Sequence, residues 1–468
     1  MKPSKNFFGG LLLIKKGKFM QTNILKKAFD KITESPARVF TIGFLIVITL
    51  GGLILSTPFV TQSGKRTGII DAFFVAASAT CVTGLTPVNT GMHWNTLGHV
   101  VIIILIQIGG LGVMSIASLV PLILRKKIGL KSRQILRDQF NIESMAGMIN
   151  LFIYVLIFTF SVEALGALFL SFRFVPTYGL GKGIWYAVFH SISAFCNAGF
   201  DILGDSIYPL RADYLVNITI MLLIIIGGLG FMVTSEIFYR RDLKKISTNS
   251  KLVLVITLIL ILVGAFGFYL LESLQGGVLD GEGFGPGMLE SFFQSVVART
   301  AGFYSVDLSK IKVSTSLLLI GLMFIGGSPG STAGGIKTTT FGVLVIATIS
   351  VIKNEKEPVV FGRSISDESI KKALSIFMIS LTIVLLVSFT ISITDNFNFI
   401  DILYETTSAL ATVGASRGIT PELSRIAKIL LGLCMYLGRI GPMTMAYAFG
   451  LKAEDKMIKY PETFISLG

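Results

Sequence analysis

The same sequence unit occurs four times along this chain of 468 residues. Each copy has an apolar span, a short semi-polar helix that ends at a glycine, and a second apolar span. Such regular repetition predicts one architecture built from four equivalent parts. The positions that align are an aromatic residue (Phe74, Phe189, Phe292 and Tyr404), a mostly serine position (Ser78, Ser193, Val296 and Ser408) and the glycine itself (Gly84, Gly199, Gly302 and Gly414).

The apolar spans are long enough to cross a lipid bilayer. Charged residues make up 15% of the chain, against roughly 25% in soluble domains. About 20 residues cross a hydrocarbon core, whereas a helix of about 12 residues cannot. The sequence therefore predicts an all-α integral membrane protein with eight transmembrane helices around a central pore, in pseudo-four-fold arrangement. The first spans cover about 39–58, 150–171, 252–271 and 373–393, and the second spans about 97–123, 215–238, 314–350 and 426–450.

Lysine and arginine predict the orientation in the membrane. The formal net charge of +14 is concentrated in alternate polar segments, which is the positive-inside bias. Both termini are therefore expected in the cytoplasm of a cell-membrane protein, with anionic lipids rather than nucleic acid near the basic segments. The predicted division is a cytosolic tail (1–38), four pore repeats (39–123, 150–238, 252–350 and 373–450), cytosolic loops (124–149, 239–251 and 351–372) and a second cytosolic tail (451–468).

The loops that end the short helices are candidate selectivity-filter strands. Irregular backbone at membrane depth survives where protein buries it or where it lines a water-filled cavity. Each short helix aims its negative carbonyl end at the pore centre, and glycine permits the backbone angles that turn carbonyl groups toward the axis. A ring of such carbonyls can replace the hydration shell of K⁺. The predicted K⁺-binding strands are Val82, Thr83 and Gly84; Asn197, Ala198 and Gly199; Thr300, Ala301 and Gly302; and Thr412, Val413 and Gly414.

A glycine-rich stretch at 324–340 interrupts the second span of the third repeat. Five glycines and a proline within residues 326–335 cannot continue a helix. Ile336 separates the last glycine from Lys337, so the stretch is not a phosphate-binding P-loop. It predicts an intramembrane gate, made of Gly326, Gly327, Ser328, Pro329, Gly330, Ser331, Thr332, Ala333, Gly334, Gly335 and Lys337, together with Arg439 of the last span.

Arg439 is a second anomaly, because a charge at membrane depth is costly unless it is paired or hydrated. It is either part of the gate or a structural arginine paired with loop carbonyls. Only the third repeat is expected to have an interrupted helix. The glycine clusters at 109–112 and 227–230 are interpreted as half-helix breaks that allow close packing.

The four repeats and the segment TCVTGLTPV resemble the superfamily of K⁺ transporters that comprises Trk, Ktr and the plant HKT proteins, most of all the KtrB membrane subunit of bacterial Ktr systems. The resemblance implies channel-like K⁺ uptake, selectivity set by the four glycines, and a positive barrier at Arg439. It also implies a homodimer regulated by a cytosolic ring of nucleotide-binding RCK subunits of the KtrA or KtrC type, which bind ATP or ADP. Na⁺ is left open as an activator, and no organic cofactor is expected.

Two alternatives remain open from the sequence. A coupled cation symporter would use the same architecture. A sensory or scaffold membrane protein with a vestigial pore would not need four intact filter glycines. No metal cluster, nucleophile triad or nucleotide motif stands out in the sequence, so an enzyme is not expected.

Overall fold

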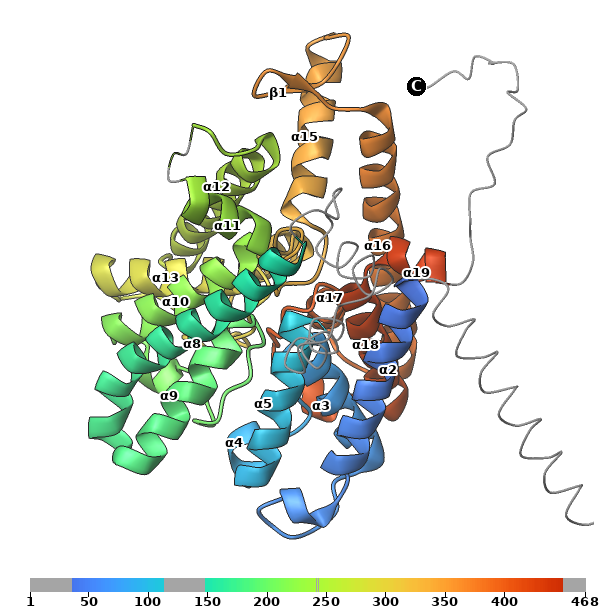
Figure 1. Cartoon of the computed structure of the whole chain (residues 1–468). Helices are drawn as coiled ribbons and strands as arrows, with labels where there is room; N and C mark the ends of the chain where they lie inside the picture. The colour runs from blue at the N-terminus through green and yellow to red at the C-terminus, as the bar shows by residue number, and fades with distance from the viewer. Residues whose placement is uncertain (1–35, 113–147, 241, 243, 449–468) are drawn as a thin grey trace, which may run out of the picture.

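The computed structural model describes residues 36–112, 148–240, 242 and 244–448, and within them the four repeats are helical and similar (Figure 1). Each repeat has a first helix, a short pore helix and a second helix. In chain order these are α2 (Pro36–Leu55), α3 (Ile69–Cys81) and α5 (Thr96–Leu111); α8 (Met148–Tyr178), α9 (Leu180–Phe195) and α10 (Tyr214–Leu229); α12 (Thr248–Glu272), α13 (Phe284–Val297) and α14 (Val313–Phe324); and α16 (Asp367–Thr394), α17 (Phe399–Leu410) and α18 (Arg425–Ile440).

Shorter elements connect or extend these helices. On the connections lie η1 (Pro58–Val60), α4 (Thr90–His93), η2 (Tyr208–Leu210) and η3 (Thr420–Glu422), and extending the second helices are α11 (Phe231–Arg240), α15 (Thr338–Ile352) and α19 (Pro442–Ala448). Strands β1 (Val359–Val360) and β2 (Arg363–Ser364) form an antiparallel hairpin in which Val359 faces Ser364. The hairpin lies at one end of the molecule, where α15 and α16 extend beyond the other helices (Figure 1).

The four first helices, α2, α8, α12 and α16, are each long and apolar enough to cross a membrane. Their outer faces leave large apolar side chains exposed, among them Leu53, Ile157, Leu258 and Leu386. A soluble protein rarely shows such extensive apolar surface, whereas lipid tails solvate it without cost. The predicted all-α membrane architecture of four repeats is therefore confirmed.

The second helices differ from the prediction. Each has 12 to 16 residues. At 1.5 Å per residue that is at most about 24 Å, so each ends before it has crossed the hydrocarbon core. After Gly230 the chain resumes as α11, bent by 97° from α10. In the fourth repeat α18 ends before Gly441 and α19 follows. The expectation that only the third repeat is interrupted is wrong.

Equivalent glycines end three of the second helices. Gly112, Gly230 and Gly441 have φ of 86°, 94° and 88° with ψ of 137°, 138° and 140°. Side chains disfavour such backbone angles, so glycine is needed at each break. The residues that follow Gly112 lie outside the described part of the chain.

Apolar packing between repeats forms the core. One buried cluster joins the first three repeats and includes Ile106, Phe189 and Phe293. A second cluster joins the first repeat to the fourth, through residues such as Phe74 and Leu431. A third joins the third repeat to the fourth. The repeats therefore pack as a closed arrangement.

Candidate functional site

The four predicted filter strands begin with the same unusual backbone conformation. Four of the seven non-glycine residues with positive φ in the described chain are the first residues of these strands: Val82 (59°), Asn197 (59°), Thr300 (79°) and Thr412 (53°). The glycine two positions later is also left-handed in every repeat. Successive carbonyl groups can then face one side instead of alternating as in a β-strand. Left-handed β-branched residues are outliers that persist only where their surroundings hold them.

The four glycines form a closed ring, which we call the glycine ring. A side-chain carbon on any of them would lie within 2.7 Å of the carbonyl oxygen that precedes the glycine of a neighbouring repeat. The pairs run around the molecule and return to the start: Gly84 to Ala198, Gly199 to Ala301, Gly302 to Val413, and Gly414 to Thr83. The ring thus gathers one backbone carbonyl from each repeat, and a side chain at any of the four positions would collide with backbone.

Serines at the aligned position of the pore helices form hydrogen bonds with the backbone of the filter strands. The hydroxyls of Ser78 and Ser408 each accept a hydrogen bond from the backbone N–H of the ring glycine in their repeat, both at 3.0 Å. In the second repeat the Ser193 hydroxyl instead donates to the Phe200 carbonyl at 2.7 Å. These bonds connect the rigid pore helix directly to the strand.

In the third repeat, the pore-helix residues lie one position closer to the ring glycine than the predicted alignment assumes. Ser295, seven positions before Gly302, donates to the Ile261 carbonyl on the first helix of its repeat. Ser191, eight positions before Gly199, makes the matching bond to Glu163. The fully buried aromatic residue of the third pore helix is accordingly Phe293, and the assignment of Phe292 is wrong. The third strand has no serine hydroxyl behind it, because Val297 takes that place.

Residues 325–337, which we call the 325–337 loop, lie against the broken end of α10. The backbone N–H groups of Ser328 and Thr332 donate to the carbonyls of Gly228 (3.0 Å) and Gly227 (3.3 Å), and the N–H of Phe231 donates to Gly330 (2.9 Å). The carbonyls at a helix C-terminus have no partners within the helix. The loop and the broken helix therefore satisfy each other's backbone groups.

The ends of the loop are held together. Ile325 and Ile336 form a parallel bridge, and the hydroxyls of Ser328 and Thr338 lie 3.0 Å apart. Lys337 is the N-cap residue that precedes α15, and its Nζ donates to the Ala333 carbonyl at 2.8 Å. The predicted gate residues of this repeat therefore form one compact loop.

Arg439 joins this loop to the first repeat. Its guanidinium donates to the Thr332 carbonyl in the loop and to the carbonyls of Gly109 and Gly110 at the end of α5. A cation at a helix C-terminus is also favoured by the helix dipole. The pairing with loop carbonyls that the sequence left open is therefore present.

A cavity of about 550 Å³ borders the loop, and none of the filter-strand residues lines it. Residues from all four repeats line it, including Phe44, Phe231, Lys337, Arg439 and Met443. Both positive side chains of the predicted gate thus border the same space.

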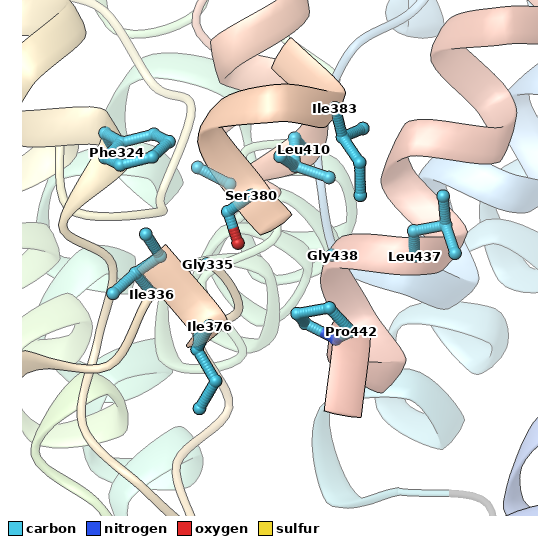
Figure 2. Close-up of a pocket in the computed structure, with 11 residues that line it drawn as sticks. Phe324, Gly335, Ile336, Ile376, Ser380, Ile383, Leu410, Leu437, Gly438 and Pro442 are labelled. Carbon is cyan, nitrogen blue, oxygen red and sulfur yellow. The ribbon is translucent and has the colours of Figure 1, made fainter. Parts of the chain in front are cut away.

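A much smaller pocket of about 20 Å³ lies where the end of the loop meets α16. Figure 2 shows its lining, which is apolar except for Ser380, with Phe324 and Ile336 on one side and Leu437 and Pro442 on the other. Ligand sites occupy roughly 300 Å³ or more, so this pocket is a packing gap.

Beyond the fourth filter strand, Arg417 connects the fourth repeat to the third. It pairs with Asp401 and donates to the carbonyls of Leu308 and Ile311 and to the Ser316 hydroxyl. Asp307 nearby is an ordinary loop acid: the Ser309 hydroxyl, 2.6 Å away, and Lys310 hold the pKa of its carboxyl below the usual range. No sequence signal indicated the role of Arg417, because its partners in the third repeat lie about a hundred positions away.

Four re-entrant pore helices around a ring of backbone carbonyls, on a scaffold of lipid-facing helices, define a pore-loop membrane transport protein. The chain belongs to the TrkH family, described as cation transport protein, which it matches over residues 16–460. It is 41% identical over 451 residues to the potassium/sodium uptake protein NtpJ of Enterococcus hirae, covering 95% of this chain and 100% of that protein.

Two further comparisons agree. The Ktr system potassium uptake protein B of Bacillus subtilis is 41% identical over 442 residues, covering 94% of this chain and 99% of that protein. The crystal structure of the potassium transporter TrkH from Vibrio parahaemolyticus superposes with a TM-score of 0.67 at 20% identity, over 88% of this chain and 85% of that one. The last of these establishes the fold alone.

Proposed function

We propose that this chain is the membrane subunit of a K⁺ uptake system and conducts K⁺ in a channel-like manner through the glycine ring. The observation that carries the proposal is the ring itself, in which each repeat contributes one carbonyl and no position has room for a side chain. Carbonyl oxygens in such a ring can replace the hydration shell of K⁺. Relatives that are 41% identical are named as potassium or potassium/sodium uptake proteins, which supports K⁺ as the cargo and leaves Na⁺ as an activator to be tested.

The 325–337 loop and Arg439 are the proposed gate. The loop borders the cavity, and Gly335 packs close to the carbonyl of Ala411, just before the fourth filter strand. Arg439, from the fourth repeat, holds the loop and connects it to the first repeat. In this proposal the loop contacts keep the gate closed, and their removal should open it.

Regulation is proposed to come from separate subunits. The name Ktr system assigns the Bacillus relatives to a multicomponent system. We propose a homodimer of this chain in the plasma membrane, with cytoplasmic termini and a cytosolic RCK ring of KtrA or KtrC type that binds ATP or ADP. The proposed docking segments for this ring are the basic segments 1–38, 124–149 and 239–251, of which the first two lie almost wholly outside the described residues.

The test is cation uptake by cells that lack other K⁺ uptake and express the regulator. The wild-type chain should restore growth at low K⁺, and Gly84→Ser should lower K⁺ uptake relative to Na⁺. Gly64→Ser is the matched control, because Gly64 also has a positive φ of 65° but has open space around it on an outer loop. Residual Rb⁺ uptake by Gly84→Ser shows that the variant folds. Failure of the wild-type chain to restore growth would overturn the proposal.

One observation favours a coupled symporter as the second candidate. Glu163 is buried in α8, where the Gln107 amide donates to both carboxylate oxygens at 3.1 and 3.4 Å. It has no ion-pair partner among the described residues. Such an intramembrane carboxyl group is a candidate proton carrier. Loss of the pH dependence of K⁺ uptake in Glu163→Gln would support coupling, and unchanged pH dependence would support the channel-like mechanism.

A further inference from the structure

Thr332, in the middle of the 325–337 loop, contacts the second filter strand directly. Its side chain is fully buried. The hydroxyl donates to the carbonyl of Phe195, the last residue of pore helix α9, at 3.2 Å. It also lies 3.4 Å from the side-chain amide of Asn197, the first residue of the strand. The loop is therefore attached to the filter as well as lying beneath it.

The Asn197 amide joins three parts of the pore. Besides Thr332, it lies 3.3 Å from the hydroxyl of Thr300, the first residue of the third filter strand. With the amide in its other orientation, its nitrogen donates to the carbonyls of Phe195 and Ile224, both at 3.2 Å. Asn197 has a left-handed φ of 59°, a conformation that asparagine tolerates better than most residues. Its side chain is thus placed to connect the loop to two filter strands.

The loop also contacts the fourth strand. A side chain on Gly334 would overlap the Thr412 hydroxyl, which has no hydrogen-bond partner within the described structure. Movement of the loop would therefore remove neighbours from the second and fourth strands together, and from the third strand through Asn197. The glycine ring follows two residues later in each strand.

We propose that the Thr332–Asn197 contact couples the gate to the filter, so that the position of the loop sets ion selectivity as well as flux. Thr332 and Asn197 then act as positioning residues for the glycine ring. This inference rests on the proposed function. A loop that only blocks the pore would change the flux of all cations by the same factor, whereas a coupled loop changes the ratio between them.

The experiment compares Thr332→Val with Thr332→Ser, because valine has the same shape without the hydroxyl and serine retains it. Ser331→Ala is the control, since that hydroxyl donates only within the loop, to Ser328 at 2.7 Å. Initial rates of Rb⁺ and Na⁺ uptake are measured for the three variants beside Gly84→Ser. Thr332→Val should raise both rates and lower the Rb⁺/Na⁺ ratio by about twofold to tenfold, the range expected for one hydrogen bond.

Thr332→Ser and Ser331→Ala should keep the wild-type ratio. Thr300→Val should lower the ratio too, and the double variant with Thr332→Val should fall short of the product of the single effects, because both act through the Asn197 amide. An unchanged ratio in Thr332→Val, while Gly84→Ser still shifts it, would refute the coupling and leave the filter assignment intact. No shift in Gly84→Ser would remove the proposed function and this inference with it.

Discussion

Substitution of Arg439 by lysine separates the two roles that we propose for this side chain. As a positive barrier it needs only its charge, which lysine keeps. As a restraint on the 325–337 loop it needs the forked guanidinium, which reaches the Thr332 carbonyl in one direction and the Gly109 carbonyl in another. A lysine side chain ends in one ammonium group, which is a point charge and not a fork of donors. It therefore cannot bridge the Thr332 and Gly109 carbonyls as the guanidinium does.

The magnitude follows from the bonds that are lost. A hydrogen bond from a charged donor contributes about 1.5–3 kcal/mol. Loss of the loop bond should therefore shift the closed-to-open equilibrium by about 10-fold to 140-fold, at about 1.4 kcal/mol per tenfold change. Both Arg439→Lys and Arg439→Gln should show this increase in Rb⁺ uptake when the regulator is absent.

The control is Arg425→Gln, the same change at the exposed beginning of the same helix, which should leave uptake unchanged. Uptake is normalised to the amount of folded protein in the membrane. Wild-type uptake in Arg439→Lys together with high uptake in Arg439→Gln would refute the restraint and leave only the barrier.

Three further predictions concern the filter, the helix breaks and the loop that follows the third filter strand. Ser408→Ala leaves the Gly414 N–H without its acceptor, so K⁺ over Na⁺ selectivity should fall, measured as an uptake ratio. Gly230→Ala requires φ of 94° and brings Cβ to 2.6 Å from the Pro329 carbonyl, so the yield of folded protein should collapse. The pKa of Asp307 is lowered in the folded protein, so its contribution to stability is complete above the unfolded-state pKa. That contribution is lost as the pH falls through the folded-state pKa. Asp307→Asn should therefore flatten the acid side of a profile of melting temperature against pH.

The sequence predicted those structural features that recur in each repeat or that depend on the local residue types. Gly84 and its three counterparts, the serines behind them and the interruption before Lys337 all follow from spacing and residue type. The break at Gly441 was missed because its neighbour Arg439 replaces the second glycine that marks the equivalent breaks at 109–112 and 227–230.

Contacts between repeats could not be predicted. The bonds from Arg439 to Gly109 and from Arg417 to Leu308 join residues far apart in the chain, and their acceptors are backbone carbonyls that carry no side-chain signature. The register of the third pore helix was misjudged by one residue because alignment on the glycine assumes equal loop lengths, whereas the burial of Phe293 is a property of packing.

The left-handed residues that begin the filter strands give the permeating ion a thermodynamic role. Val82, Thr300 and Thr412 are β-branched, and each such backbone conformation costs about 1–3 kcal/mol. A K⁺ ion bound to the glycine ring would bind the folded chain and not the unfolded one, and would stabilise it by mass action. The melting temperature of the protein should then rise with K⁺ concentration, more than with Na⁺ at equal ionic strength. The transported K⁺ would then also be a structural ligand of the pore. Depletion of K⁺ would lower the stability of the folded chain at the glycine ring.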